Sequence, residues 1–495
     1  MFLKGLIKEV NSVRIVGERI ENWEAIEITG LTDDSRFVKK GDLFFCRKGG
    51  TVDSHAFAKE AVEKGAAAIV CEKQLPIAFP QVLVDDSREA MALISAEFYG
   101  HPSQKLKIIG ITGTNGKTTT SYMLSSIIRR AGKSVAVVGT LGIFYGKKRI
   151  APELTTPDPI FLQATLADMA LSGVEYVVME VSAHALHYKK DASIKYAACI
   201  FTNLTQDHLD FFADMSAYGE AKKKLFSPQK TPLCILNGDD PFGREIGLQR
   251  KEQCRESEDG ALYYGLETPC EAFAIVTEET VYGAELVLNL MDGICRVPLS
   301  MTGVHNVYNA LAAAACAYSL GFTLSEVAEG IRQVKRVKGR LEPVAEFCGG
   351  KIFVDFAHTP DGLEKSLRAL KKHTKGNLIC LFGCGGNRDK TKRPLMGETV
   401  AKNADFSVLT SDNPRYEDPL DIIVDIERGY RKYSTRYVIV PDREKAIGYA
   451  IDMLKEGDVL LLAGKGGEEY QEIMGIKYVS NDNDIIKKII RSKGL

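Results

Sequence analysis

The residues best suited to chemistry lie in one glycine-rich segment, Gly113-Thr114-Asn115-Gly116-Lys117-Thr118-Thr119. Glycine lets backbone N–H groups close around phosphate oxygens, and a helix that begins near Lys117 would add positive potential. Lys117 can neutralise terminal phosphates, and the Thr118 hydroxyl can bind Mg²⁺. The spacing departs from G-x-x-x-x-G-K-[ST] because position 111 is Ile. The segment predicts a nucleotide-phosphate site; a glycine turn with a chance Gly-Lys-Thr is the alternative.

The elements around this loop alternate between strands and helices. An apolar run at 107–113 predicts a strand that enters the loop, and further strands are predicted at 134–140, 176–182 and 197–204. Helical patterns cover 158–172 and the Ala-rich 306–321, and Thr323 with Glu326 forms a capping box. This alternation predicts a parallel sheet covered on both faces.

A second alternating series predicts a separate doubly wound α/β domain. Its strands are expected at 351–357, 377–386, 406–413, 437–442 and 458–466. We expect three domains: a mixed α/β domain at 1–103, a central P-loop parallel-sheet domain at 104–335, and a C-terminal Rossmann-like domain at 336–495. At 495 residues the chain is too long for one ordinary core.

Composition narrows the classes of partner. The formal net charge is −1, with 64 Lys plus Arg against 65 Asp plus Glu, so no global field favours nucleic acid or membrane. The first residues lack a signal-peptide pattern, and no apolar run reaches membrane-spanning length. Eleven cysteines without a framework favour reduced thiols. We therefore expect a cytoplasmic protein without nucleic-acid partners or membrane insertion. We also expect a monomer whose ligands are small molecules, although composition does not determine either property.

The GTNGKTT form of the loop resembles that of the Mur ligases and the folylpolyglutamate synthetases. Further motifs occur in the Mur ligase order, and the resemblance extends over all three predicted domains. These motifs are Glu180-Val181-Ser182, Asp207-His208-Leu209-Asp210, His305-Asn306, Gly339-Arg340-Leu341-Glu342 and Asp355-Phe356-Ala357-His358-Thr359-Pro360-Asp361. Within that family the chain is similar to the ligases that add the third peptide residue to a UDP-N-acetylmuramoyl dipeptide, a precursor of peptidoglycan.

The resemblance implies ATP-dependent amide formation through an acyl phosphate, which needs metal ions and cations around phosphoryl oxygens. Thr118 and Glu180 offer hard oxygen ligands for Mg²⁺. His208 resembles the ligand of a second metal ion, and Lys222 matches the lysine that the family carbamylates with CO₂. Alone, Lys222 belongs to a basic run at 222–224 that would be solvated helix surface.

The resemblance also implies which residues contact ATP. Beyond residues 113–119, the matched positions are Asn306 and Asn309, about one helical turn apart, with Arg340, Asp355 and His358. Lys117, His208, Lys222 and Arg340 are the expected catalytic residues.

Other matched residues are expected to bind the UDP-linked precursor. Ser35 lies in the uridine-site segment Thr32-Asp33-Asp34-Ser35-Arg36, and Thr155, Thr156, Ser182 and Lys190 match muramoyl-peptide positions. Two of the positions depart from the family. Leu154 stands where many relatives are polar, and Lys190 replaces an arginine, which keeps the charge but loses planar bidentate geometry.

The segment Asp412-Asn413-Pro414-Arg415 resembles the diaminopimelate-type signature of the family. An arginine can hold the distal carboxylate of meso-diaminopimelate with two parallel hydrogen bonds, and lysine lacks that carboxylate. Arg388, Gly464 and Glu468 complete the matched amino-acid site, with Glu468 suited to the ammonium. Asn387 and Gly467 replace the more usual Asp and His.

Alternatives remain open at this point. The same ligase could add L-lysine, or the chain could be a folylpolyglutamate synthetase or the ligase of the next wall-building step. A nonenzymatic ATP-binding regulator is the rival of another class. A dinucleotide oxidoreductase is disfavoured because the loop lacks G-x-G-x-x-G.

Overall fold

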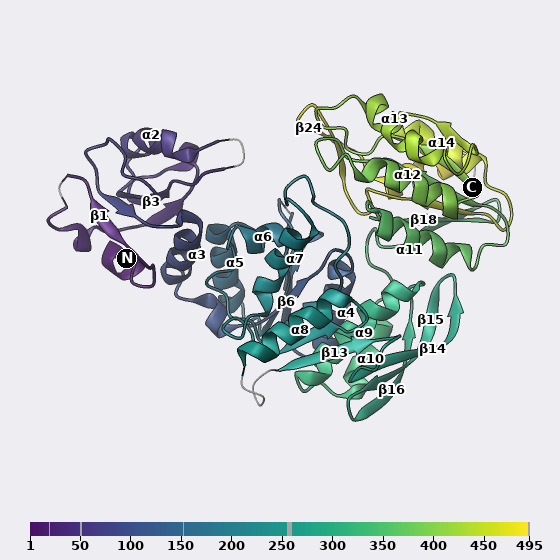
Figure 1. Cartoon of the computed structure of the whole chain (residues 1–495), viewed down its shortest axis with the longest axis horizontal. Helices are drawn as coiled ribbons and strands as arrows, with labels where there is room; N and C mark the ends of the chain where they lie inside the picture. The colour runs from purple at the N-terminus through teal and green to yellow at the C-terminus, as the bar shows by residue number, and fades with distance from the viewer. Residues whose placement is uncertain (19, 50–51, 152, 255–259, 494–495) are drawn as a thin grey trace. The chain divides into compact units, whose positions relative to one another are not determined.

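The computed structural model of the chain describes residues 1–18, 20–49, 52–151, 153–254 and 260–493 (Figure 1). Two compact units can be distinguished. The first comprises Met1–Gly110, Ser134–Ala198 and Ser227–Pro232, and the second comprises Ile111–Lys133, Cys199–Phe226 and Leu233–Leu495. Domain boundaries at 103 and 335 stay predictions.

The first unit begins with a five-stranded sheet of order β1-β5-β4-β3-β2, in which only β1 is antiparallel to its neighbour. Successive residues of β3 point to opposite faces, so Leu43 and Phe45 join one apolar cluster and Phe44 joins the other. The sheet is therefore buried on both faces. Its elements are β1 Arg14–Val16, β2 Gly30–Thr32, β3 Asp42–Phe45, β4 Ala68–Cys71, β5 Gln81–Leu83, α1 Leu3–Leu6, α2 Ala58–Glu63 and α3 Ser87–Phe98, with short 3-10 helices η1 Trp23–Ala25, η2 Ser35–Phe37, η3 Ser54–Phe57 and η4 Pro102–Lys105.

The rest of the first unit contains part of the central sheet. The predicted strands at 134–140 and 176–182 are confirmed as β7 and β10, which pair in parallel. The sheet then departs from the predicted parallel pattern, because β8 and β9 continue from β7 in antiparallel order. Gly139 pairs with Gly142, so residues 140–141 form a tight turn. The elements are β7 Val135–Gly139, β8 Gly142–Tyr145, β9 Lys148–Ile150, α5 Pro159–Leu171, β10 Tyr176–Glu180 and α6 Ala183–His187.

The second unit contains the phosphate loop, which lies between β6 and α4. Helix α4 packs against α10 at Gly330, where an added Cβ would lie 2.4 Å from the Ile127 Cα. The Thr323–Glu326 capping box is confirmed by both of its hydrogen bonds. The elements are β6 Lys107–Thr112 (which crosses the division between units), α4 Lys117–Arg130, β11 Ala198–Phe201, α7 Met215–Lys223, η5 Lys224–Phe226, β12 Cys234–Asn237, α8 Pro241–Gln253, β13 Ala261–Gly265, α9 Val304–Ser319 and α10 Leu324–Gln333.

An antiparallel extension follows β13 that the alternating sequence series does not include. Strand β13 pairs in parallel with β14, and β14, β15 and β16 form an antiparallel meander. Its bounds are β14 Ala272–Thr280, β15 Gly283–Leu290 and β16 Gly293–Leu299.

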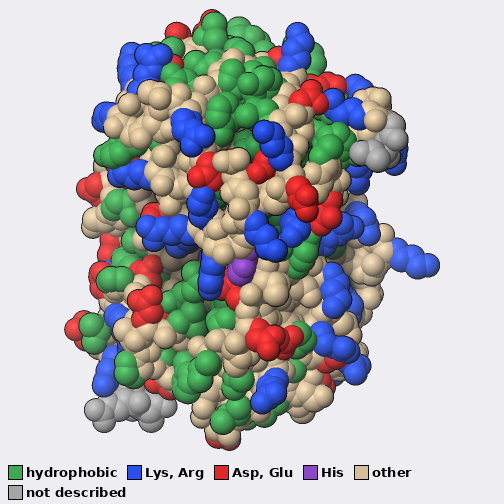
Figure 2. Space-filling view, turned by 90° about the vertical axis from the view of Figure 1, so that its right-hand side faces the viewer, with side chains coloured by type: hydrophobic (Ala, Val, Ile, Leu, Met, Phe, Trp, Pro, Cys, Tyr) green, Lys and Arg blue, Asp and Glu red, His purple; other side chains and the backbone are tan. Residues whose placement is uncertain are grey.

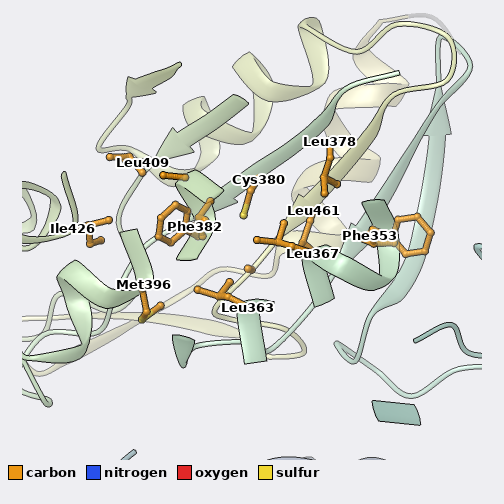
Figure 3. Packing of buried hydrophobic residues seen from close by; sticks show 14 of the residues in the cluster. Phe353, Leu363, Leu367, Leu378, Cys380, Phe382, Met396, Leu409, Ile426 and Leu461 are labelled. Atoms are coloured by element: carbon orange, nitrogen blue, oxygen red, sulfur yellow. The ribbon is translucent and has the colours of Figure 1, made fainter. Parts of the chain in front are cut away.

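The predicted doubly wound region is confirmed as a six-stranded sheet of order β17-β18-β22-β19-β20-β21. All its pairings are parallel except that of the unpredicted β17. Phe353, Phe382 and Leu461 project into one apolar cluster with side chains from the neighbouring helices (Figure 3). A ribbon of β23 and β24 was also not predicted. The elements are β17 Glu342–Phe347, β18 Gly350–Val354, α11 Pro360–Lys371, β19 Leu378–Phe382, α12 Lys392–Asn403, β20 Phe406–Leu409, α13 Pro419–Tyr430, β21 Tyr437–Ile439, α14 Arg443–Asp452, β22 Val459–Leu462, β23 Tyr470–Ile473, β24 Ile476–Val479 and α15 Asp482–Ser492.

Surface charge is mixed. On the face in Figure 2, lysine and arginine side chains are interspersed with aspartate and glutamate, in keeping with the nearly balanced totals. Within the described ranges, no helix combines the length and apolar composition needed to cross a membrane.

One buried ion pair joins α14 to α15, and its loss should lower the stability of the protein. Arg443 and Asp482 have side chains 2% and 0% exposed, with Nη2 2.6 Å from Oδ2. Asp482→Asn leaves the guanidinium buried without its counter-charge, so we expect a loss of about 3–5 kcal/mol of unfolding free energy in urea titrations. Glu444→Gln removes an exposed partner of Lys488 and should cost at most about 1 kcal/mol. Equal effects of the two substitutions would contradict this view.

Candidate active site

The phosphate loop requires glycine at two positions. Gly113 and Gly116 have φ of 146° and 90°. A Cβ at Gly113 would lie 1.9 Å from the Thr202 Oγ1, and a Cβ at Gly116 would lie 2.3 Å from the Asn309 Oδ1. The loop is therefore packed tightly against both neighbours, and only glycine fits at these two positions.

Lys117 folds back over this loop. Its Nζ donates to the carbonyl oxygens of Gly113 at 2.7 Å and Thr114 at 2.9 Å. Asn115 ties the loop to two other segments, since its N–H donates to the Asn203 Oδ1 at 2.9 Å and its Nδ2 donates to the Asp361 Oδ2 at 2.9 Å. The positive charge of Lys117 thus lies within a rigid loop, as phosphate binding requires. Thr118 and Thr119 follow on α4 and are each 3% exposed.

The predicted asparagines on α9 are placed beside this loop. Asn309 Nδ2 donates to the Asn306 Oδ1 at 3.2 Å, and the Asn309 Oδ1 accepts from the Thr120 Oγ1 at 3.3 Å. Asn306 also donates to the Thr302 carbonyl at 2.8 Å. The helical-turn spacing expected from the sequence is confirmed.

Arg340 lies in the segment before β17 and contacts helix α4. Its Nη2 donates to the Thr118 Oγ1 at 3.0 Å, and its guanidinium lies 4.3 Å from the Phe356 ring centroid. Asp355 holds the neighbouring backbone, because its Oδ1 accepts from the Leu341 N–H at 3.1 Å and its Oδ2 accepts from the Ser366 hydroxyl at 2.5 Å. In this structure the Asp355 carboxylate therefore fixes the position of Arg340.

Lys222 is buried on α7, with 1% of its surface exposed and its Nζ 4.2 Å from the Tyr218 ring centroid. Burial and the nearby charge of Lys117 hold the pKa of Lys222 well below its usual range, although Asp207 opposes the shift. A depressed pKa favours the neutral amine, which is the nucleophilic form of lysine.

Asp207 is the anion at the centre of this region. It contacts Lys392 Nζ at 3.3 Å, His208 Nε2 at 3.4 Å and His358 Nε2 at 3.6 Å. Burial raises its pKa, but the contact with His358 and the charges of Lys392 and His208 outweigh burial and hold it well below the usual range. His208 has a left-handed φ of 57°, stabilised by its N–H donating to the Asp207 Oδ1 at 2.9 Å.

In the first unit, Glu180 ends β10 with 1% of its surface exposed. Its carboxylate accepts from the Thr140 N–H at 3.1 Å and from the Thr140 hydroxyl at 2.9 Å. Its carbonyl accepts from the Thr156 hydroxyl at 2.9 Å. Carboxylate oxygens are the donors that a hard cation prefers.

The predicted precursor residues occupy two regions of this unit. Thr155, Thr156 and Ser182 gather at the end of β10, where the Ser182 N–H donates to the Thr156 Oγ1 at 3.0 Å. Lys190 pairs with Asp158 at 2.7 Å. Ser35 lies separately on η2, 8% exposed, and donates to the Glu60 Oε2 at 3.3 Å. Leu154 is 48% exposed.

The predicted amino-acid residues come together on two loops after β20 and β22. Asn413 Nδ2 donates to the Glu468 Oε2 at 2.8 Å, and a Cβ at Gly464 would lie 2.5 Å from the Asp412 Oδ2. Arg415 has a φ of 53° and donates through Nη1 to the Gly386 carbonyl at 2.8 Å. Arg388 is exposed on the neighbouring loop and donates to the Asn387 carbonyl at 3.4 Å.

Several contacting residues were not identified from the sequence. Glu472 accepts from the Arg415 Nε at 3.2 Å, and the fully buried Lys465 Nζ lies 3.3 Å from the Glu468 Oε2. Thr140 and Lys392 were also missed. Lys392 and Lys465 stand next to recognised glycine motifs, a signal that could have found them, whereas Thr140 and Glu472 have no distinctive local pattern.

The sequence matches three family models, described as Mur ligase family catalytic domain over residues 27–99, Mur ligase middle domain over 111–317, and Mur ligase glutamate ligase domain over 339–466. A protein of Geobacillus thermodenitrificans named UDP-N-acetylmuramoyl-L-alanyl-D-glutamate–2,6-diaminopimelate ligase is 42% identical, over 93% of this chain and 94% of the relative. A Clostridium acetobutylicum protein with the same name, numbered 1, is 42% identical over 99% of both chains. A solved structure of a ligase with this name has a TM-score of 0.68 at 30% identity, covering 96% of each chain.

The loop geometry predicts that Lys117→Met weakens nucleotide binding, because a charge-assisted bond to phosphate is lost. We expect a loss of about 2–5 kcal/mol of binding free energy for an ATP analogue, measured by calorimetry. Lys251→Met, on an exposed position at the end of α8, is the matched control and should bind like the wild type. Unchanged affinity in Lys117→Met would contradict the phosphate-site assignment.

Proposed function

The chain belongs to the Mur ligase family, and we propose from that premise that it uses ATP to join meso-diaminopimelate to UDP-N-acetylmuramoyl-L-alanyl-D-glutamate. Members of this family are ATP-dependent ligases that form amide bonds. The observation that carries the choice of substrates is the group formed by Asn413, Arg415 and Glu468, which offers a cation and an anion on adjoining loops.

The reaction has two balanced steps. A carboxylate oxygen of the precursor attacks the γ-phosphorus of ATP, so the acyl phosphate forms and ADP leaves. The amine of the incoming amino acid then attacks the acyl carbon, phosphate leaves, and the amine loses a proton. Lys117 and Arg340 offset the charge on the transferring phosphoryl group, and Gly113–Thr119 holds the nucleotide phosphates.

Thr118 and Glu180 would be ligands of Mg²⁺, His208 would be a ligand of a second metal ion, and the carbamate of Lys222 would add a further oxygen ligand. The metal ions would supply positive charge next to the phosphoryl oxygens. The buried Glu180 carboxylate, which is oriented by the N–H and the hydroxyl of Thr140, supports this ligand set. ATP would also be contacted by Asn306, Asn309, Asp355 and His358.

We infer that Lys222 carries a carbamate. A buried ammonium beside Lys117 is unfavourable, and the neutral amine that burial favours is the form that adds to CO₂. The product is an oxygen anion, which can bind a cation that an ammonium would repel. Carbamylation therefore turns an electrostatic cost at α7 into a metal ligand.

The three predicted segments receive separate tasks. Residues 1–103 bind the UDP moiety through Ser35, residues 104–335 carry ATP and phosphoryl transfer, and residues 336–495 bind the amino acid. Thr155, Thr156, Ser182 and Lys190 hold the muramoyl peptide. The close approach of Thr155 and Thr156 to the Glu180 end of β10 supports a shared site for peptide and metal.

Arg388, Arg415 and Glu468 select the amino acid, aided by Asp412, Asn413, Pro414 and Gly464. A guanidinium pairs with the distal carboxylate, and Glu468 accepts from the ammonium. We propose that the enzyme is a cytoplasmic monomer acting on small molecules alone. The near-balanced net charge supports that setting, as do the eleven cysteines, all of which lie within the described ranges and none of which forms a disulfide there.

The function is tested by phosphate release with ATP, Mg²⁺ and UDP-N-acetylmuramoyl-L-alanyl-D-glutamate, comparing meso-diaminopimelate with L-lysine. Mass spectrometry should identify the diaminopimelate product, with lysine used far more slowly because it lacks the distal carboxylate. Preference for lysine would overturn the specificity but keep the ligase. No product with either amino acid would overturn the ligase assignment.

Arg415→Lys provides the sharper test of amino-acid recognition, because it keeps the charge and loses the planar fork. We expect kcat/KM for meso-diaminopimelate to fall, by an amount that corresponds to a loss of about 2–5 kcal/mol of transition-state stabilisation. The KM for ATP should stay unchanged. Arg431→Lys, an exposed arginine after α13, serves as the control. An equal loss of kcat/KM for meso-diaminopimelate and L-lysine, or no loss for either, would contradict a contact between Arg415 and the distal carboxylate.

A further inference from the structure

Thr140 contacts both Glu180 and Thr155, which have different roles in the proposed function. It lies in the turn between β7 and β8, and its hydroxyl donates to the Glu180 Oε2 at 2.9 Å while its N–H donates to the Oε1 at 3.1 Å. The same hydroxyl lies 3.2 Å from the Thr155 Oγ1. One side chain of the first unit therefore touches both the proposed cation ligand and a proposed precursor ligand.

The protons in this triad can be assigned from chemistry. A threonine hydroxyl carries one hydrogen, and an ionised carboxylate can only accept. The Thr140 hydrogen therefore belongs to Glu180, and the short contact with Thr155 requires the Thr155 hydroxyl to donate to the Thr140 oxygen. Thr155 is then left with lone pairs only, so it can accept but not donate to a ligand.

The surroundings hold the triad in place. An added Cβ at Gly139 would lie 2.1 Å from the Glu180 Oε1, so only glycine lets the turn approach the carboxylate this closely. Thr156, 2% exposed, ties the same segment to the Glu180 carbonyl and to the Ser182 N–H. Hydrogen bonds in this partly buried environment are stronger than in water and favour this arrangement of the triad.

We propose that Thr140 is a positioning residue that couples the divalent-cation site at Glu180 to the precursor site at Thr155. It also sets Thr155 to accept a hydrogen bond from an N–H or O–H group of the precursor rather than to donate to a phosphate or carboxylate. A ligand at either end fixes the shared hydroxyl, so the second ligand meets a triad that is already ordered. This inference rests on the proposed function, because it takes both ligands from it.

The test measures binding in place of turnover. Mn²⁺ affinity is measured by electron paramagnetic resonance with and without UDP-N-acetylmuramoyl-L-alanyl-D-glutamate, for the wild type, Thr140→Val and Thr140→Ser. We expect the precursor to tighten Mn²⁺ binding by about fivefold or more in the wild type and in Thr140→Ser, because both keep the hydroxyl. Thr140→Val should bring that ratio close to unity. Thr165→Val removes a buried hydroxyl of α5 that donates to the Phe161 carbonyl of the same helix, and should keep the wild-type ratio.

Thr155→Val removes the other end of the contact and serves as the second variant should Thr140→Val fail to fold in a melting curve. It should also lose the coupling, and adding Thr140→Val to it should change the ratio no further. A wild-type ratio in Thr140→Val or Thr155→Val, or no coupling in the wild type, would overturn the inference alone. If the wild type binds neither Mn²⁺ nor the precursor, the proposed function itself fails.

Discussion

The arrangement of the second unit depends on the burial of one lysine. Lys222 is almost fully buried near a second cation, Lys117, and burying a charged ammonium there costs free energy. Asp207 partly offsets the charge, and it is held in turn by Lys392 and by two histidines. These charges join the phosphate loop to α7, to the loop before α11 and to the first residue of α12. A carbamate on Lys222 would complete that balance with an anion able to bind metal.

The same principle of paired charges organises the amino-acid pocket. Arg415 is held by Glu472 and by the Gly386 carbonyl, and Glu468 is held by Asn413 and Lys465. Side chains fixed in this way lose little further freedom when a ligand binds, so more of the interaction energy is available for recognition. We propose that the pocket distinguishes amino acids by the charges at their distal end, because a ligand without the distal carboxylate would leave Arg415 with its protein partners alone.

Local sequence predicted the elements that carry the site, because strands with buried runs and capped helices are determined by nearby residues. The strand before Gly113, the helix from Lys117 and the Thr323 capping box were all confirmed. The antiparallel strands β14 to β16 were missed, since an alternating pattern alone does not reveal which strand lies next to it. Thr140, Lys392 and Glu472 could not be assigned because their importance lies in contacts with residues distant in sequence. Asp355 illustrates the same limit, because its motif did not reveal that its carboxylate accepts hydrogen bonds from the Leu341 N–H and the Ser366 hydroxyl. Its contact with the nucleotide stays a prediction.

We propose that the precursor carboxylate is activated by phosphorylation within this charge-balanced site. The experiment that decides this prepares the precursor with oxygen-18 in its reacting carboxylate and follows the label during turnover with ATP and meso-diaminopimelate. An acyl phosphate predicts that the released inorganic phosphate carries a labelled oxygen from the carboxylate, in step with formation of the amide product. Product formation with unlabelled phosphate would contradict the account, because the carboxylate oxygen would then never have been bonded to phosphorus.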